Sequence, residues 1–248
     1  MTEKQLDFII SFHKKLYRQG PGSDEETLKA INFTGLSEST ELSILDLGCG
    51  TGSQTNVLAN HLNGTITALD LFQPFLDELE DRIKSPNVRT FQGSMDDLNF
   101  EKESFDLIWS EGAVYNMGFE NGLNYLHPFL KKNGVIALSE ITWLTNERPA
   151  DIETYWNAEY PEIDSAQGKI KTLHESGYQL IDHFILSEES WLSNYYGALE
   201  MEFAVLMEDH SIEEELKVVI QSYQNEIATY KTFKEYFGYG FYIAKKVN

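Results

Sequence analysis

Hydrophobic positions in the middle of the chain form short apolar runs that alternate with segments of helical spacing. Five runs are expected to be strands: Leu42–Leu47, Thr65–Asp70, Val88–Gly93, Phe105–Ser110 and Val135–Glu140. Between them, apolar residues recur every three or four positions, as in Val57–Leu62 and Phe75–Ile83, which is typical of amphipathic helices. Strands separated by helices predict a parallel sheet with right-handed crossovers and helices on both faces.

The flanking segments extend this pattern. Residues 6–17 have helical spacing, and Ser23 with Glu26 has the spacing of a capping box that begins a second helix. Near the other end we expect a strand at His183–Ser187, a helix from Ser211 to Ile227 and a last, antiparallel strand at Tyr239–Lys246. The expected fold is therefore an α/β, Rossmann-like doubly wound sheet of seven mostly parallel strands, with helices on both faces and an antiparallel last strand.

Composition and charge narrow the class of partner. The chain has 248 residues, of which 42% are hydrophobic and 24% are charged, as in ordinary globular proteins. Its formal net charge of −21 disfavours binding to nucleic acid and to anionic membranes, because like charges repel. Cys49 is the single cysteine, and no apolar run reaches the roughly 18 residues of a membrane span. These features predict a cytoplasmic protein without disulfides or a membrane segment.

The segment ILDLGCGTGSQ, Ile44 to Gln54, is the strongest chemical signal. A buried strand ends at Asp46, and a loop with Gly48, Gly50 and Gly52 leads into a helix. Glycines are required where a backbone turns with positive φ or where a ligand touches the main chain. The loop is thus either a ligand-binding loop or a glycine-rich turn that binds nothing.

The glycine spacing separates two classes of ligand. Dinucleotide-binding loops have the pattern G-x-G-x-x-G, whereas Ser53 stands here at the position of the third glycine. The pattern G-x-G-x-G after an acidic residue resembles the first motif of class I S-adenosylmethionine-dependent methyltransferases. The resemblance implies that S-adenosylmethionine is the cofactor, that the loop holds its methionyl part and that Asp46 fixes the amino-acid end directly or through water.

Asp70 closes the second strand about 20 residues beyond the loop, where a carboxylate is suited to accept both hydroxyls of an adenosine ribose. Leu71 and Phe72 follow and are expected to cover one face of the adenine. The alternative is that Asp70 only caps the next helix.

Two later segments continue the resemblance. After the third strand, the resemblance assigns reading of the adenine edge to Ser94 and Met95, with Asp96 as a further contact to the exocyclic amine. After the fourth strand, it places Ser110, Glu111 and Tyr115 near the methionyl amine and the substrate. The segment SEGAVY lacks the proline box of enzymes that methylate DNA bases, so nucleic acid is again disfavoured.

The resemblance covers residues 43–140. The first 22 residues, the acidic aromatic stretch after the fifth strand and the ending FGYGFYIAKK also look like bacterial small-molecule methyltransferases of the ubiquinone/menaquinone C-methyltransferase-like (methyltransferase type 11) branch. The resemblance implies transfer of a methyl group to a small molecule by in-line displacement. With Glu111 and Glu140 expected at the rim of the site beside aromatic residues, the pocket would suit a neutral or cationic acceptor. If the acceptor must lose a proton, the candidate bases are Glu111, Tyr115 and Glu140, the last expected at the end of the fifth strand. A non-catalytic S-adenosylmethionine- or nucleotide-binding module and a dehydrogenase-like dinucleotide binder stay open as alternatives. The histidines are scattered, and no metal site is expected.

We expect one domain over residues 1–248. Its parts are an N-terminal helical cap (1–41), the S-adenosylmethionine-binding core (42–140), a lid-like insertion and helix (141–182) and C-terminal strands and helices (183–248). The stretch 141–165 is rich in aromatic residues and has no clear period, so we expect Tyr155, Trp156 and Tyr160 to form a lid together with Arg18–Ser23. Alternatively, these aromatic residues fill the fold or form a dimer contact; monomer and homodimer both remain open.

Overall fold

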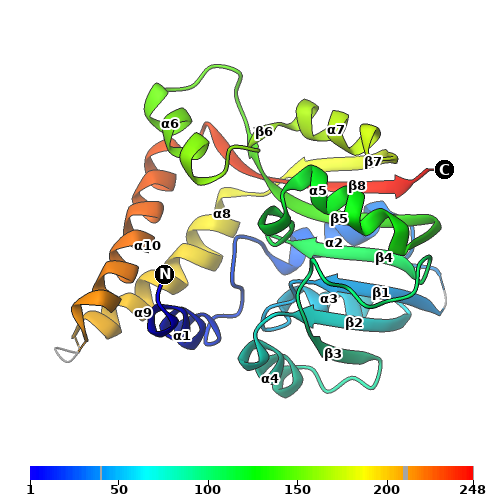
Figure 1. Cartoon of the computed structure of the whole chain (residues 1–248), viewed down its shortest axis with the longest axis horizontal. Helices are drawn as coiled ribbons and strands as arrows, with labels where there is room; N and C mark the ends of the chain where they lie inside the picture. The colour runs from blue at the N-terminus through cyan, green and yellow to red at the C-terminus, as the bar shows by residue number, and fades with distance from the viewer. Residues whose placement is uncertain (40, 209–211, 248) are drawn as a thin grey trace.

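The computed structural model describes residues 1–39, 41–208 and 212–247, and it contains one mixed sheet (Figure 1). The main strand order is β3-β2-β1-β4-β5-β8-β7, and β6 pairs with β5 at one side of this path. The strands are β1 (Leu42–Leu47), β2 (Gly64–Asp70), β3 (Val88–Gln92), β4 (Phe105–Glu111), β5 (Leu130–Trp143), β6 (Asp164–Ser165), β7 (Tyr178–Ile185) and β8 (Phe237–Lys246).

The expected fold class is confirmed. The strands β1 to β5 pair in parallel, and β8 lies antiparallel between β5 and β7. All seven expected strands are present, and the two-residue β6 is an addition. The fifth strand is longer than expected, because residues 141–143 continue it and pair with β8. Glu140 is therefore inside β5, paired with Gly240, and the expectation that it ends the strand is wrong.

Helices cover both faces of the sheet because side chains of a strand alternate between the faces. Ile44 packs with α2 (Asp24–Thr34) and α3 (Ser53–His61), and Ala68 packs with α4 (Gln73–Arg82). Leu45 faces the opposite side, where α5 (Phe119–Leu126) and α7 (Ala166–Glu175) complete the core. These layers leave open the edge at which the parallel strands end.

Helix starts agree only partly with the capping prediction. Ser23 caps α2 by accepting a hydrogen bond from the Glu26 amide at 3.1 Å. The reciprocal bond of a capping box is not made, because the Glu26 carboxylate accepts hydrogen bonds from the Ser187 amide, at 2.6 Å, and from the Ser190 hydroxyl. The last helix, α10, spans Glu214–Phe233, and the expected start at Ser211 lies outside the described residues.

A helical lobe stands beside the end of the sheet toward which β4 points (Figure 1). It has its own aromatic-rich core, which includes Phe12, Trp191, Tyr196 and Tyr230. The lobe consists of α1 (Glu3–His13), α6 (Ala150–Glu159), α8 (Glu188–Trp191), α9 (Gly197–Glu208) and α10, with a π-helical turn at Leu192–Tyr196. The stretch 141–165, which has no clear period in the sequence, contains the end of β5, helix α6 and β6. None of the helices in the described ranges is long and apolar enough to cross a membrane.

Candidate functional site

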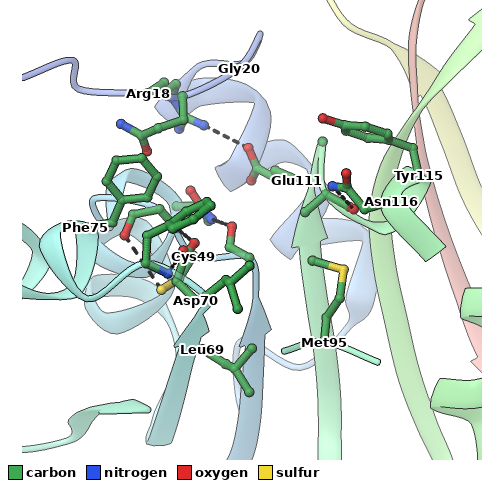
Figure 2. Close-up of a pocket in the computed structure, with 18 of the residues that line it drawn as sticks. Arg18, Gly20, Cys49, Leu69, Asp70, Phe75, Met95, Glu111, Tyr115 and Asn116 are labelled. Carbon is green, nitrogen blue, oxygen red and sulfur yellow. Dashed lines mark hydrogen bonds and ion pairs between the residues drawn. The ribbon is translucent and has the colours of Figure 1, made fainter. Parts of the chain in front are cut away.

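A cavity of about 390 Å³ lies at the carboxyl ends of β1, β2 and β4 (Figure 2). In an open α/β sheet this edge is where ligands bind. In the close-up, Asp70 and Phe75 lie on one side and Met95 and Tyr115 on the other, with Arg18 and Glu111 above. The walls come from five segments: Arg18–Pro21, the loop after β1, the end of β2, residues 93–96 after β3 and residues 111–117 after β4.

The glycine loop has the backbone conformation that its sequence predicts. Gly48, Gly50 and Gly52 have φ angles of 71°, 54° and 90°, in the left-handed region that side chains disfavour. Gly48 and Gly50 line the cavity, whereas Gly52 does not. A Cβ atom on Gly52 would lie 2.6 Å from Cγ of Leu79 in α4, so this glycine serves the packing of the loop against a helix.

Asp70 lies in the cavity wall with its carboxylate held by two backbone amides. Oδ2 accepts a hydrogen bond from the Gly50 N–H at 2.9 Å, and Oδ1 accepts one from the Phe72 N–H at 3.0 Å. Burial raises the pKa of Asp70, and these two bonds oppose the shift. Because each carboxylate oxygen has a second lone pair, Asp70 can still accept two hydrogen bonds from a ligand.

Asp46 does not line the cavity. It is fully buried and accepts hydrogen bonds from the Thr55 hydroxyl at 2.5 Å and from Nε2 of Gln54 at 3.3 Å, and burial raises its pKa to about 7. Gln54 does line the cavity, so any action of Asp46 on a ligand passes through Gln54. Ser110 is also outside the lining, since it is buried and donates to the carbonyl of Leu47.

The remaining expected cofactor residues come together in the first cavity. Leu71 and Phe72 lie beside Asp70. Ser94, Met95 and Asp96 line the cavity after β3, and the Ser94 hydroxyl donates a hydrogen bond to the Asp96 carboxylate.

Glu111 lines the cavity, but its carboxylate is already bonded. Oε2 contacts Nη1 of Arg18 at 2.8 Å, and Oε1 accepts hydrogen bonds from the Thr27 hydroxyl at 2.7 Å and the Trp109 indole at 2.9 Å. One lone pair of Oε2 stays free, but protonation of Glu111 would leave the buried Arg18 guanidinium without its buried counter-charge. Glu111 therefore fits the role of an anchor for Arg18.

A second cavity of about 320 Å³ adjoins the first. The two share Gly112 and Tyr115 after β4, Phe72 and Phe75 near α4, and residues 19–21 of the N-terminal segment. The helical lobe supplies the other walls, mostly with aromatic rings: Tyr155, Trp156, Trp191, Tyr195, Tyr196 and Tyr223, joined by Phe237 and Tyr239 of β8. Tyr160, expected in the lid, instead packs edge-on against Tyr115 with ring centroids 6.2 Å apart.

Glu140 lines neither cavity, so the expectation that it lies on the rim is wrong. It is buried, and its Oε1 lies 3.9 Å from Nζ of Lys169 in α7. Burial raises its pKa to about 7. Because β5 continues to Trp143, Glu140 lies within the strand, and its side chain is on the face of the sheet that α7 covers.

Two features of the lining were not expected from the sequence: the bonds of Gln19, which lies in the expected lid segment Arg18–Ser23, and the presence of Glu226. Gln19 bonds to Thr51 through both its amide nitrogen and oxygen, and Glu226 reaches the second cavity from α10. Nothing in the local pattern distinguishes Glu226 from the other acidic residues of an amphipathic helix. Across the described ranges, no group of three or more His, Cys, Asp or Glu side chains is placed to hold a metal.

Comparison with known proteins finds similarity to methyltransferases over part of the chain. Residues 44–134 match the family model described as a methyltransferase domain. The chain is 33% identical over 116 residues to a malonyl-[acyl-carrier protein] O-methyltransferase of Paenibacillus sp. and 33% identical over 127 residues to a demethylmenaquinone methyltransferase of Lactococcus lactis. These alignments span 44% and 49% of the chain, but only 42% and 44% of the relatives.

A solved structure extends the likeness in fold to the whole chain. It is a methyltransferase of Thiobacillus denitrificans in complex with S-adenosyl-L-homocysteine, with a TM-score of 0.81, 18% identity and 99% of each chain covered. At this identity the match concerns the fold, including the helical lobe.

Proposed function

We propose that the chain is a class I, S-adenosylmethionine-dependent methyltransferase that transfers a methyl group to a small-molecule acceptor. The match of residues 44–134 to a methyltransferase domain and the similarity to two methyltransferases support this. The observation that supports this most is the contact between the two cavities. The first has the volume and position of a cofactor site, and the second opens beside it with Tyr115 in the shared wall.

The residues of the first cavity fit S-adenosylmethionine. Asp70 has two lone pairs available for the ribose hydroxyls, and Leu71 and Met95 offer apolar surface to the adenine. Gln54 and the Gly48 backbone would hold the amino-acid end. The volume of about 390 Å³ is within the usual range of roughly 300–1,000 Å³ for small-molecule sites.

When bound, S-adenosylmethionine supplies a methyl group already activated on a sulfonium sulfur. The residues of the chain then have to align an acceptor with that methyl group and exclude water, and such alignment lowers a barrier by roughly 7–11 kcal/mol. The aromatic walls of the second cavity are suited to both tasks.

Of the three expected bases, Tyr115 is the one whose side chain lines both cavities and makes no ion pair. Burial raises the pKa of its hydroxyl, which therefore stays protonated at neutral pH. We assign Tyr115 the role of donating a hydrogen bond that orients the acceptor.

Two measurements test the proposal. Calorimetry should show one S-adenosylhomocysteine bound per chain, and incubation with methyl-labelled S-adenosylmethionine and a metabolite extract should place label in small molecules and not in added DNA or RNA. Absence of binding would contradict the methyltransferase assignment. Binding without transfer to any component of the extract would instead favour a non-catalytic binding module.

A further inference from the structure

The second cavity contains one acidic side chain and no side chain that is positively charged at neutral pH. Glu226 is the acid, and none of the lining residues is Lys or Arg. His13 also lines the cavity, but burial lowers its pKa to about 4, so it is neutral at pH 7. The side chains that line this cavity therefore include no positive group at pH 7, and Glu226 is the one that can carry a negative charge.

Glu226 has little compensation within the described part of the chain. Its Oε1 accepts one hydrogen bond from the Tyr196 hydroxyl at 2.9 Å, and no ion pair of the described residues includes it. Burial raises the pKa of Glu226, the hydrogen bond from Tyr196 opposes this shift, and the nearby negative charge of Glu159 adds to it. A carboxylate removed from water is unfavourable unless a positive group or several hydrogen bonds balance it, so a cation would be stabilised beside Glu226.

The rings around Glu226 provide the second component of a cation site. Tyr155 and Trp156 come from α6, Trp191 and Tyr195 from α8 and the turn after it, and Tyr223 from α10. The face of an aromatic ring attracts ammonium groups, and several rings around one cavity form the aromatic cage that binds quaternary ammonium ligands. An anionic acceptor would meet the opposite potential here.

We propose that the second cavity recognises an ammonium group of the methyl acceptor through Glu226 and the surrounding aromatic rings. This inference rests on the methyltransferase function proposed above. It names the substrate class, alkylammonium compounds, whichever atom of the acceptor receives the methyl group.

A pair of isosteric probes tests the inference without turnover. Choline carries a quaternary ammonium, and 3,3-dimethylbutan-1-ol has the same shape without the charge. With S-adenosylhomocysteine at saturation, tryptophan fluorescence from Trp156 and Trp191 should report choline binding about tenfold tighter than the alcohol, the scale of a desolvated cation–π contact plus an ion pair. Glu226→Gln, which keeps an acceptor for Tyr196, should reduce this difference to the part that the aromatic rings contribute.

Two controls separate the possible results. Glu235→Gln removes one exposed negative charge just beyond α10 and should leave the choline affinity unchanged. Equal affinity of the wild type for choline and the alcohol, tighter binding of malonate than of choline, or a Glu226→Gln variant with undiminished preference for choline would overturn the inference. The comparison of choline with the alcohol on the wild-type protein tests the inference even if Glu226→Gln does not fold. Failure of S-adenosylhomocysteine to bind would instead refute the proposed function.

Discussion

Arg18 and Glu111, 93 positions apart in the sequence, form a buried ion pair at the first cavity, with Nη1 and Oε2 2.8 Å apart. Both side chains are less than a tenth exposed, whereas the second partner of Arg18, Asp24, is 44% exposed. The pair joins the N-terminal segment to the end of β4 (Figure 2). The Arg18 guanidinium thus has one buried partner, Glu111, and one exposed partner, Asp24.

We expect Glu111→Gln to lower the free energy of unfolding by about 3 kcal/mol, because it leaves a buried guanidinium without its buried counter-charge. Asp24→Asn is the matched control and should cost at most about 1 kcal/mol, as exposed ion pairs do. Urea denaturation of both variants measures the difference. Equal losses of unfolding free energy in the two variants would show that burial does not determine the strength of the Arg18–Glu111 ion pair.

Asp70→Ala should weaken S-adenosylhomocysteine binding by about 1.5–3 kcal/mol, the range for hydrogen bonds to a charged group. The variant removes the acceptor for two ligand hydroxyls and also releases the Gly50 and Phe72 amides. Asp77→Ala, on the exposed side of α4 with a bond only to Gln73, is the control. Calorimetry with unchanged affinity in a folded Asp70→Ala variant would remove Asp70 from the site.

The sheet and half of the site could be predicted because local patterns determine them. A continuous apolar run identified β1, and the acid that ends β2 had to lie near the glycine loop because parallel strands end at one edge. Asp70 and Gly50 accordingly meet.

Residues whose positions depend on distant partners could not be predicted. The apolar run of β5 seemed to end at Glu140, but Trp143 still pairs with Phe237 of β8, about 90 residues later. The second cavity combines α1, α6, α8 and α10, and no local spacing shows that these helices meet. Asp46 was expected to face the ligand, yet the hydroxyl of Thr55 directs it toward α3.

The buried Asp46 predicts a pH dependence of stability. Burial raises its pKa from 3.8 to about 7 in the folded protein, so folding favours its protonated form. The associated stability is complete below pH 3.8 and is lost as the pH rises through about 7. Asp46→Asn lacks this titration, so its stability relative to the wild type should rise by a few kcal/mol, on the order of 2–4, between pH 4 and pH 8.

Urea denaturation of the wild type and Asp46→Asn at pH 4, 6 and 8 measures this difference. Comparing the two proteins at each pH cancels the contribution of the other titrating groups. A constant difference across the three pH values would mean that Asp46 is ionised in the folded state throughout.

The last prediction concerns closure over the ligands. Tyr155 and Trp156 line the second cavity from α6, a helix in which Ile152 is the one buried residue and these two rings are partly buried, so ligands that contact the rings would add to the packing of the helix. The Arg18–Ser23 segment borders the first cavity but is already tied down by the Arg18–Glu111 pair. Ligands should therefore order α6 more than the N-terminal segment.

Hydrogen exchange with S-adenosylhomocysteine and choline added together should show slower exchange in residues 152–163, a smaller change in residues 18–23 and none in β1. If neither segment gains protection, the lid hypothesis is wrong. If these aromatic residues form a dimer contact instead, protection of 152–163 will depend on protein concentration and not on the ligands, because association and ligand binding shift different equilibria. Repeating the exchange at two protein concentrations, with and without ligands, therefore distinguishes a lid from an interface.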